Sequence, residues 1–295
     1  MSESWIKEGA SLGAINIFTT IHSKYNNLTN TEKKVADYVL ENPKSVVYMS
    51  ITDLADICGV GESSIFRFCK SLSYKGYQDF KIAIAHSITV ENEIPQLTDK
   101  VLMNDSIGQV ASKVLATNIS ALNETYNLID SAKIDQAIEL LLQAEKIIFF
   151  GVGSSLMTAM EAKIKFMRIT NKTECTIDSH LQMMSAALMT KRDVAVIISY
   201  SGSTKDSIEV AKKAKDSGAT VISITRFEKS PLTSYSDLTL LCGANEGPLQ
   251  GGSLSAKISQ LYLLDVLYVE YFKRSYEESI RNKESTAESV VVKLL

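Results

Sequence analysis

The chain has 295 residues, a formal net charge of −3 and a hydrophobic content of 45%. This length leaves room for two domains with a core each, and the hydrophobic content argues against long disordered stretches. The near-neutral charge excludes a surface that is basic throughout, so any DNA contact must come from a local patch. Apolar runs stop short of the roughly 18–20 residues that span a bilayer, and the first residues lack a secretory pattern. We therefore expect a cytoplasmic protein without membrane contact.

The cysteine and histidine patterns give no sign of a bound metal. The four cysteines are scattered in apolar surroundings without a C-x-x-C pair, and the three histidines share no ligand spacing with them. This usage is typical of thiols buried in a reducing compartment. We expect neither a metal nor a cofactor.

Residues 1–88 have helical periodicity only and predict an all-α domain. Thr29 and Glu32 form a capping box that opens one helix, and Ser50 caps a later one. A Gly-Val-Gly turn at 59–61 leads into a further helix. The apolar residues of the two helices around this turn recur at i, i+3, i+4 and i+7: Ile51, Leu54, Ala55 and Cys58, then Ile65, Phe68, Cys69 and Leu72. Two short helices joined by a turn that contains Gly match a helix-turn-helix.

The second of these helices would present polar and basic side chains to the major groove, where recognition helices contact base edges. Basic residues outnumber acidic ones between Glu62 and Lys81, although residues 1–88 as a whole are neutral. We predict a DNA surface made by this face, by the preceding helix and by the loop that follows: Thr52, Ser63, Ser64, Arg67, Lys70, Tyr74, Lys75 and Tyr77. Two alternatives stay open: a helical hairpin with a solvated face, and tyrosines that only pack the loop.

From residue 106 onward the pattern changes to that of an α/β domain. Helices are predicted at 106–128 and 131–144, and strands alternating with helices follow. The strands are expected at 146–150, 173–177, 194–199, 219–225 and 237–242, and the helices at 155–169, 180–190, 204–217 and 254–273. This alternation predicts a three-layer α/β/α domain over 106–273, with a five-stranded parallel sheet covered on both faces. The polar segment 89–105 is the expected linker, and 274–295 is a tail that forms either an interface helix or a frayed end.

The segment 197–205, Ile-Ile-Ser-Tyr-Ser-Gly-Ser-Thr-Lys, is the most informative in the chain. A strand runs directly into hydroxyl-bearing residues that precede a helix, so hydroxyls and backbone N–H groups crowd at a helix N-terminus. Such a neutral cradle suits a phosphate, because the helix dipole places partial positive charge there. The residues that would bind it are Ser199, Ser201, Gly202, Ser203 and Thr204. The alternative is a capped tight turn, which one Ser or Thr would satisfy.

A second loop of this kind, Gly151-Val-Gly-Ser-Ser155, follows the first predicted strand. It falls short of the dinucleotide fingerprint G-x-G-x-x-G, because Met157 and Thr158 stand near the third glycine position. Ligands of parallel sheets bind beyond the carboxyl ends of the strands, so the two loops can converge on one crevice.

These motifs together resemble the RpiR family of bacterial transcription regulators, which join an N-terminal helix-turn-helix to a C-terminal sugar isomerase (SIS) domain. The resemblance covers residues 27–273, and the order and spacing of its motifs make it specific. It rests on Ser50-Ile-Thr-Asp-Leu-Ala55, Ser64-Ile-Phe-Arg67 and Gly76-Tyr-Gln-Asp-Phe80 in the first half, and on Gly151-Val-Gly-Ser-Ser155, Ser199-Tyr-Ser-Gly-Ser203, Ile222-Ser-Ile-Thr225 and Ser230-Pro-Leu232 in the second.

The resemblance implies a repressor or activator, not an enzyme, whose SIS domain senses a phosphorylated sugar and controls sugar-catabolic genes. Two positions depart from the family pattern. Gly61 replaces a Ser that often caps the recognition helix, and Lys257 replaces an Arg, so that a point charge stands in place of a bidentate fork. We also include Glu246 and Lys257 among the candidate effector residues. By position in the family, the effector would be held by Ser154, Ser155, Ser199, Ser201, Ser203 and Thr204.

An aldose–ketose isomerase acting on a sugar phosphate is the alternative function. Its chemistry needs a general base within reach of a C–H group next to a carbonyl. Glu246 and His180 are the candidates in the second domain's loops. A simple isomerase has no use for a helix-turn-helix, and a structural scaffold leaves both Ser-rich loops unexplained.

We also expect a homodimer or homotetramer that binds a double-stranded operator, because a single helix-turn-helix on a neutral domain gathers few phosphate contacts. The helix at 258–269 is dense in apolar residues and forms either the subunit interface or part of the core.

Overall fold

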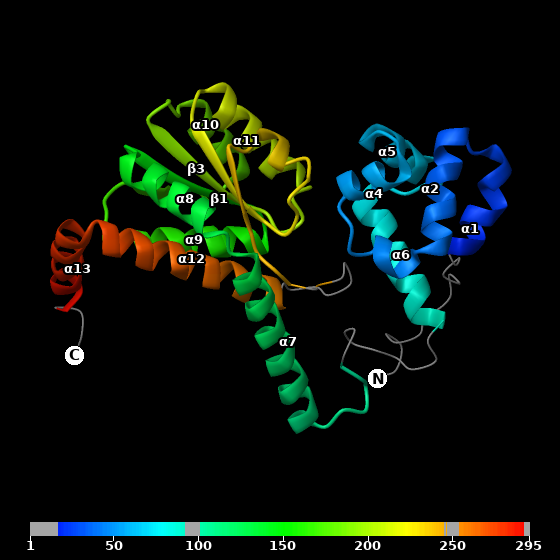
Figure 1. Cartoon of the computed structure of the whole chain (residues 1–295), viewed down its shortest axis with the longest axis horizontal. Coiled ribbons are helices and arrows are strands. Elements are labelled where there is room, and N and C mark those ends of the chain that lie inside the picture. Colours follow the sequence, from blue (N-terminus) through cyan, green and yellow to red (C-terminus); the bar gives the residue numbers. More distant parts are fainter. Residues whose placement is uncertain (1–16, 92–100, 245, 247–253, 292–295) are drawn as a thin grey trace, which may run out of the picture.

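The N-terminal part of the chain consists of helices (Figure 1), and capping residues set the limits of several of them. The computed structural model describes residues 17–91, 101–244, 246 and 254–291. Thr29 with Glu32 and Ser50 with Asp53 form capping boxes, and Gly59 ends its helix in the left-handed region, with φ of 63°. The elements of this part are α1 (Ile17–Lys24), the 3-10 turn η1 (Tyr25–Asn27), α2 (Asn30–Glu41), α3 (Pro43–Val46), α4 (Ile51–Cys58), α5 (Glu62–Ser71) and α6 (Tyr77–Glu91).

These helices share one hydrophobic core. Leu54 of α4, Ile65 and Phe68 of α5, and Phe80 of α6 are fully buried. The rings of Phe68 and Phe80 meet edge to face with their centroids 5.4 Å apart. The helix-turn-helix predicted from the apolar spacing is therefore confirmed as α4 and α5. The last turn of α6 extends to Glu91, into the segment expected to be the linker.

The second part is built on a parallel sheet of five strands in the order β2-β1-β3-β4-β5. One face of the sheet packs against α8, α9 and α12, and the opposite face packs against α10 and α11. The predicted three-layer α/β/α fold with a parallel sheet is confirmed. The strands are β1 (Lys146–Gly151), β2 (Thr173–Cys175), β3 (Asp193–Ile198), β4 (Thr220–Thr225) and β5 (Leu238–Leu241), and the helices are α8 (Ser131–Gln143), α9 (Ser154–Phe166), α10 (Ser179–Ala187), α11 (Lys205–Asp216) and α12 (Leu254–Arg274).

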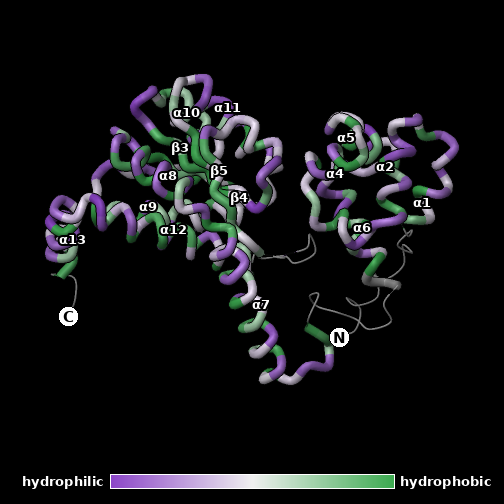
Figure 2. The backbone as a smooth tube through the Cα atoms, viewed as in Figure 1, coloured by the Kyte–Doolittle hydropathy of each residue, from purple (hydrophilic) through white to green (hydrophobic). Residues whose placement is uncertain are grey.

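Helix α7 (Ile107–Leu128) projects away from the sheet (Figure 1). Its C-terminal half is anchored by Thr125, whose Oγ1 donates to the carbonyl of Gly243 (3.1 Å) and accepts from its N–H (3.0 Å). Hydrophobic residues continue along the projecting part of the helix (Figure 2), and Ile107, Leu115 and Ile119 are exposed. This helix therefore presents an apolar surface beyond the sheet.

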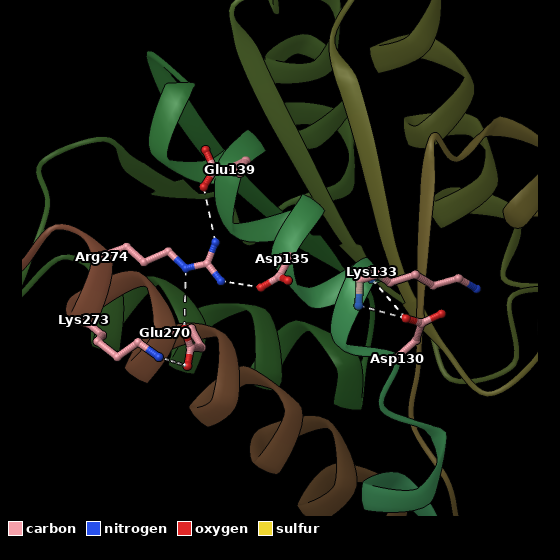
Figure 3. Close-up of polar contacts among 8 residues, drawn as sticks. Asp130, Lys133, Asp135, Glu139, Glu270, Lys273 and Arg274 are labelled. Atoms are coloured by element: carbon pink, nitrogen blue, oxygen red, sulfur yellow. Dashed lines mark hydrogen bonds and ion pairs between the residues drawn. The ribbon is translucent and has the colours of Figure 1, made fainter.

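The predicted tail begins with helix α13 (Tyr276–Val291), so a frayed end is the wrong alternative for these residues. Asn282 of α13 donates to the backbone carbonyl of Ile169 (2.9 Å). Arg274, at the end of α12, forms ion pairs with Asp135 and Glu139 of α8 and with Glu270 of its own helix (Figure 3). Within the described residues, no helix has the length and apolar character needed to cross a membrane.

Candidate effector site and DNA interface

The two hydroxyl-rich loops begin side by side at the centre of the sheet. Strands β1 and β3 are neighbours, and Gly151 at the end of β1 pairs with Ile198 at the end of β3. The chain leaves β1 toward β2 and leaves β3 toward β4, so the strand order reverses between them. Such a switch point is where open α/β sheets bind their ligands. The convergence of the two loops, expected from sequence, is thus present in the strand order.

The loop after β3 has a conformation that requires its glycine. Gly202 has φ of 59°, and a β-carbon at this position would collide with the side chain of Ser230. Backbone hydrogen bonds join Gly202 N–H to Ser199 (3.1 Å) and Leu232 N–H to Gly202 (2.9 Å). The loop is therefore held tightly against the segment that follows β4.

Several hydroxyls of the two loops are not used for helix capping. Ser199 Oγ is buried and has no hydrogen-bond partner among the described residues. Thr204 stands at the N-cap position of α11 but its side chain makes no cap bond, and the N-cap of α9 is Gly153. Both helices thus begin without a side-chain cap, next to the ends of the neighbouring strands β1 and β3. A helix N-terminus without a side-chain cap suits an anion.

Glu246 and Lys257 lie at the start of α12. The Glu246 carboxylate accepts from the backbone N–H of Ala256 (2.8 Å) and from Ser255 Oγ (2.9 Å), so it caps this helix. Lys257 is half-buried in the same first turn. His180, the other candidate base, is exposed in the first turn of α10.

Tyr200 is a functional candidate that the sequence pattern did not single out. Its hydroxyl accepts from Arg226 Nη1 (2.9 Å) and donates to the carbonyl of Ala244. Burial raises the pKa of Tyr200, so the hydroxyl stays protonated and can donate. Tyr200 therefore links the loop after β3 to the segments that precede β5 and α12. Its position between two serines was the only signal in the sequence.

The segment after β4 also contacts the helix-turn-helix. Ser50 Oγ donates to the backbone carbonyl of Lys229 (3.1 Å), and Lys229 Nζ lies 2.7 Å from Asp56 Oδ2. The Asp56 carboxylate raises the pKa of Lys229 by hydrogen bonding and attraction. Because Arg226 N–H also donates to the carbonyl of Tyr200 (3.0 Å), one short segment contacts both the serine loop and α4.

Lys81 of α6 is buried close to this contact. Its ammonium donates to the carbonyl of Met49 (3.1 Å) and lies 5.1 Å from the centroid of the Tyr77 ring. Burial, with a smaller contribution from repulsion by Arg226, lowers the pKa of Lys81 to about 8.

The predicted DNA-binding side chains are mostly exposed on α5 and in the next loop. Ser63, Arg67, Lys70 and Lys75 are exposed, and Ser64 is half-buried. An open pocket runs from the start of α4 along α5 and is lined by Ile51, Glu62, Ser63, Phe66 and Arg67. Sequence reasoning missed Phe66, because an aromatic residue next to an apolar stripe is normally part of the core.

One of the predicted DNA contacts needs correction, and two others have partners within the protein. Tyr77 is buried, and its hydroxyl is within hydrogen-bonding distance of the carbonyls of Met49 (3.2 Å) and Val46 (3.3 Å). Its predicted contact with DNA is therefore wrong, because the ring and hydroxyl are used inside the core. Tyr74 is half-buried and packs edge to face on Phe80. Thr52 donates to Glu62 and ties α4 to α5.

Comparison with known proteins identifies both parts of the chain. A helix-turn-helix domain of the rpiR family matches residues 15–91, and a SIS domain matches residues 140–270. An HTH-type transcriptional regulator of Caldanaerobacter subterraneus is 35% identical over 92% of this chain and 96% of its own length. The HTH-type transcriptional regulator HexR of Pseudomonas aeruginosa is 34% identical over 85% of this chain and 87% of its own.

A solved structure has the same overall arrangement. The Vibrio vulnificus NanR protein complexed with ManNAc-6P superposes with a TM-score of 0.84 and 31% identity, covering 95% of this chain and 100% of that one. The helix-turn-helix of α4 and α5 and the five-stranded sheet lie in the two segments that match these domain families. This protein therefore belongs to the RpiR family of transcriptional regulators, in which a DNA-binding helix-turn-helix is joined to a SIS domain.

Proposed function

We propose that the crevice between the β1 and β3 loops binds the phosphate of a sugar, and that binding changes the affinity of the helix-turn-helix for its operator. The observation that carries the proposal is the buried Ser199 hydroxyl without a partner among the described residues, set between two helix N-termini that lack side-chain caps. A phosphate would accept hydrogen bonds from such groups. The NanR structure with its phosphorylated amino sugar supports this ligand class.

The proposed contacts follow from these loops. Phosphate binding is assigned to the hydroxyls and N–H groups, and Glu246 and Lys257 would contact the sugar from the start of α12. The full set is Ser154, Ser155, Ser199, Ser201, Gly202, Ser203, Thr204, Glu246 and Lys257.

Control of DNA binding would pass through the segment after β4. Arg226 and Leu232 hydrogen-bond to the serine loop, and Lys229 contacts Ser50 and Asp56 of the helix-turn-helix. A ligand can shift the operator affinity only if it prefers one arrangement of this contact over another. The protein would then regulate genes of amino-sugar or carbohydrate metabolism.

The two candidate general bases, Glu246 and His180, also fit a regulatory role better than catalysis. Among the described residues, Glu246 caps α12 and His180 is exposed, so no partner positions either side chain as a general base. We propose that the chain is not an isomerase. It would work in the cytoplasm as a homodimer or homotetramer, with the DNA-binding domain over 1–88, a linker over 89–105, the SIS domain over 106–273 and a tail over 274–295.

A thermal-shift screen tests the ligand class. Sugar phosphates should raise the melting temperature in proportion to RT ln(1 + [L]/Kd), whereas the unphosphorylated sugars should not. A ligand found in this way should then change the DNA concentration needed for half-binding in a mobility-shift titration. Turnover of that ligand by the purified protein would contradict the regulatory proposal and favour the isomerase.

A further inference from the structure

Helix α5 has an outward stripe that contains an aromatic residue. Ser63, Phe66, Arg67 and Lys70 recur at i, i+3, i+4 and i+7, which places them on one helical face. Ile65, Phe68 and Cys69, on the opposite face, are buried in the core. Phe66 is 46% exposed in the middle of the outward stripe. A single exposed aromatic residue is common on protein surfaces, so its exposure alone assigns no role.

The neighbours of Phe66 hold its ring at the rim of the open pocket. A β-carbon at Gly76 would lie 3.4 Å from Cε2 of Phe66, so the ring packs closely on the backbone of the following loop. The ammonium of Lys70 lies 5.4 Å from the ring centroid. On its other side the ring lines the pocket together with Ser63 and Arg67. The ring thus lies next to Lys70 and lines the same pocket as Arg67, and both are candidate DNA-contacting residues.

The chemistry of the major groove indicates what such a ring would meet. Base edges there present hydrogen-bond donors and acceptors, and the one apolar group is the C5-methyl of thymine. Arg67 can bind guanine or a phosphate, but neither Arg67 nor Ser63 makes an apolar contact of comparable area. We propose that Phe66 is a specificity-determining residue that contacts a thymine methyl beside the base or phosphate bound by Arg67. This inference rests on the proposed placement of α5 in the major groove.

The test uses the full-length protein and a duplex selected by the wild type from a pool with a randomised core. Each thymine of this duplex is replaced in turn by uracil, which removes only the methyl group. At one thymine per half-site, we expect this replacement to lower the affinity of the wild type about fourfold, because the contact of one buried methyl group is lost. Phe66→Ala should bind the parent duplex more weakly and should not respond to that replacement.

Ile57→Ala is the matched control, because Ile57 is a similarly exposed apolar residue (52%) on α4 outside the pocket. It should respond to uracil as the wild type does. The inference is overturned if no uracil replacement weakens the wild type, or if Phe66→Ala loses as much as the wild type at the same thymine. Failure of the wild type to select any sequence would instead contradict the proposed DNA-binding role of α5. The uracil series on the wild type remains informative even if Phe66→Ala does not fold.

Discussion

At the scale of single residues, the hydroxyls of the two loops differ in what they already bind. Ser203 N–H donates to Ser201 Oγ (3.3 Å), so Ser201 has a structural role in its own loop. Thr204 makes no side-chain cap bond although it stands at the N-cap position. Removal of its hydroxyl should therefore affect a ligand and little else.

We expect Thr204→Val to weaken binding of the cognate sugar phosphate by roughly 10- to 100-fold, because a hydrogen bond to a charged group contributes about 1.5–3 kcal/mol. Valine keeps the shape of threonine, so the melting temperature without ligand should stay unchanged. Calorimetric titration measures the affinity. Ser217→Ala, which removes a half-buried hydroxyl at the far end of α11, is the control. Wild-type affinity in Thr204→Val would mean that this hydroxyl is not part of the site.

A residue-scale prediction also applies to the DNA interface. Arg67→Ala should cost about 1–3 kcal/mol of specific DNA affinity if the guanidinium binds guanine in bidentate fashion. Mobility-shift titration against the selected duplex measures this loss, with Arg168→Ala in the SIS domain as the control for a lost positive charge. Equal affinity of Arg67→Ala and wild type, with an intact circular dichroism spectrum, would remove Arg67 from the interface.

At the scale of elements, the segment between β4 and β5 has two sets of partners. It hydrogen-bonds to the serine loop through Arg226 and Leu232, and it contacts α4 through Lys229. Both contacts come from the same few residues, so a shift of the serine loop on ligand binding has a short route to the helix-turn-helix.

A charge exchange tests this route. Lys229→Glu should reduce the change in operator affinity that the effector produces, because a carboxylate in place of the ammonium would repel Asp56. Asp56→Lys in the same chain should restore the ion pair and with it the effect of the ligand. By reciprocity, operator DNA should alter effector affinity less in Lys229→Glu than in the wild type. An unchanged effect of ligand in Lys229→Glu would show that the contact does not transmit the signal.

The burial of Lys81 predicts a pH dependence of stability. Its pKa falls from 10.5 to about 8 in the folded chain, so between these values the unfolded chain binds more protons and the free energy of unfolding rises with pH. Relative to Lys81→Met, the wild type should gain up to about 3 kcal/mol from pH 8 to pH 10.5. Below pH 8 the difference should be constant. Urea unfolding across this range measures it, and a constant difference throughout would contradict the lowered pKa.

At the scale of the whole molecule, self-association requires an exposed apolar surface. The helix expected at 258–269 lies within α12, where Leu263, Leu264 and Leu267 are buried in the sheet's core. These leucines of the helix therefore belong to the core of the SIS domain. Exposed apolar residues also lie on α7 (Figure 2): Ile107, Leu115 and Ile119.

We expect a solution mass of at least twice the 32.4 kDa of one chain. Leu115→Glu with Ile119→Glu should lower that mass, because a charged group cannot be buried unpaired in an interface. Light scattering at micromolar concentration measures it, and Val290→Glu on α13 serves as a control at another exposed apolar residue. A wild-type mass of one chain, with and without DNA, would contradict the prediction.

The sequence alone determined the type and order of most elements. Capping boxes at Thr29 and Ser50, the glycine turn at 59–61 and the alternation of strands and helices after residue 106 all depend on neighbours a few positions away. The two hydroxyl-rich loops were visible for the same reason, since each is a continuous stretch of chain at a strand end. Parallel pairing of the strands then followed from the helices between them.

Only the tertiary structure decided which side chains the predicted elements bury and which they leave exposed. Tyr77 enters the core while Phe66 remains outside, although both are aromatic residues in helical segments. The contact between Ser50 and Lys229 joins residues 179 positions apart, and no local pattern encodes it. Local propensities act within a turn or a cap, whereas burial and long-range contacts depend on how the finished elements pack against one another.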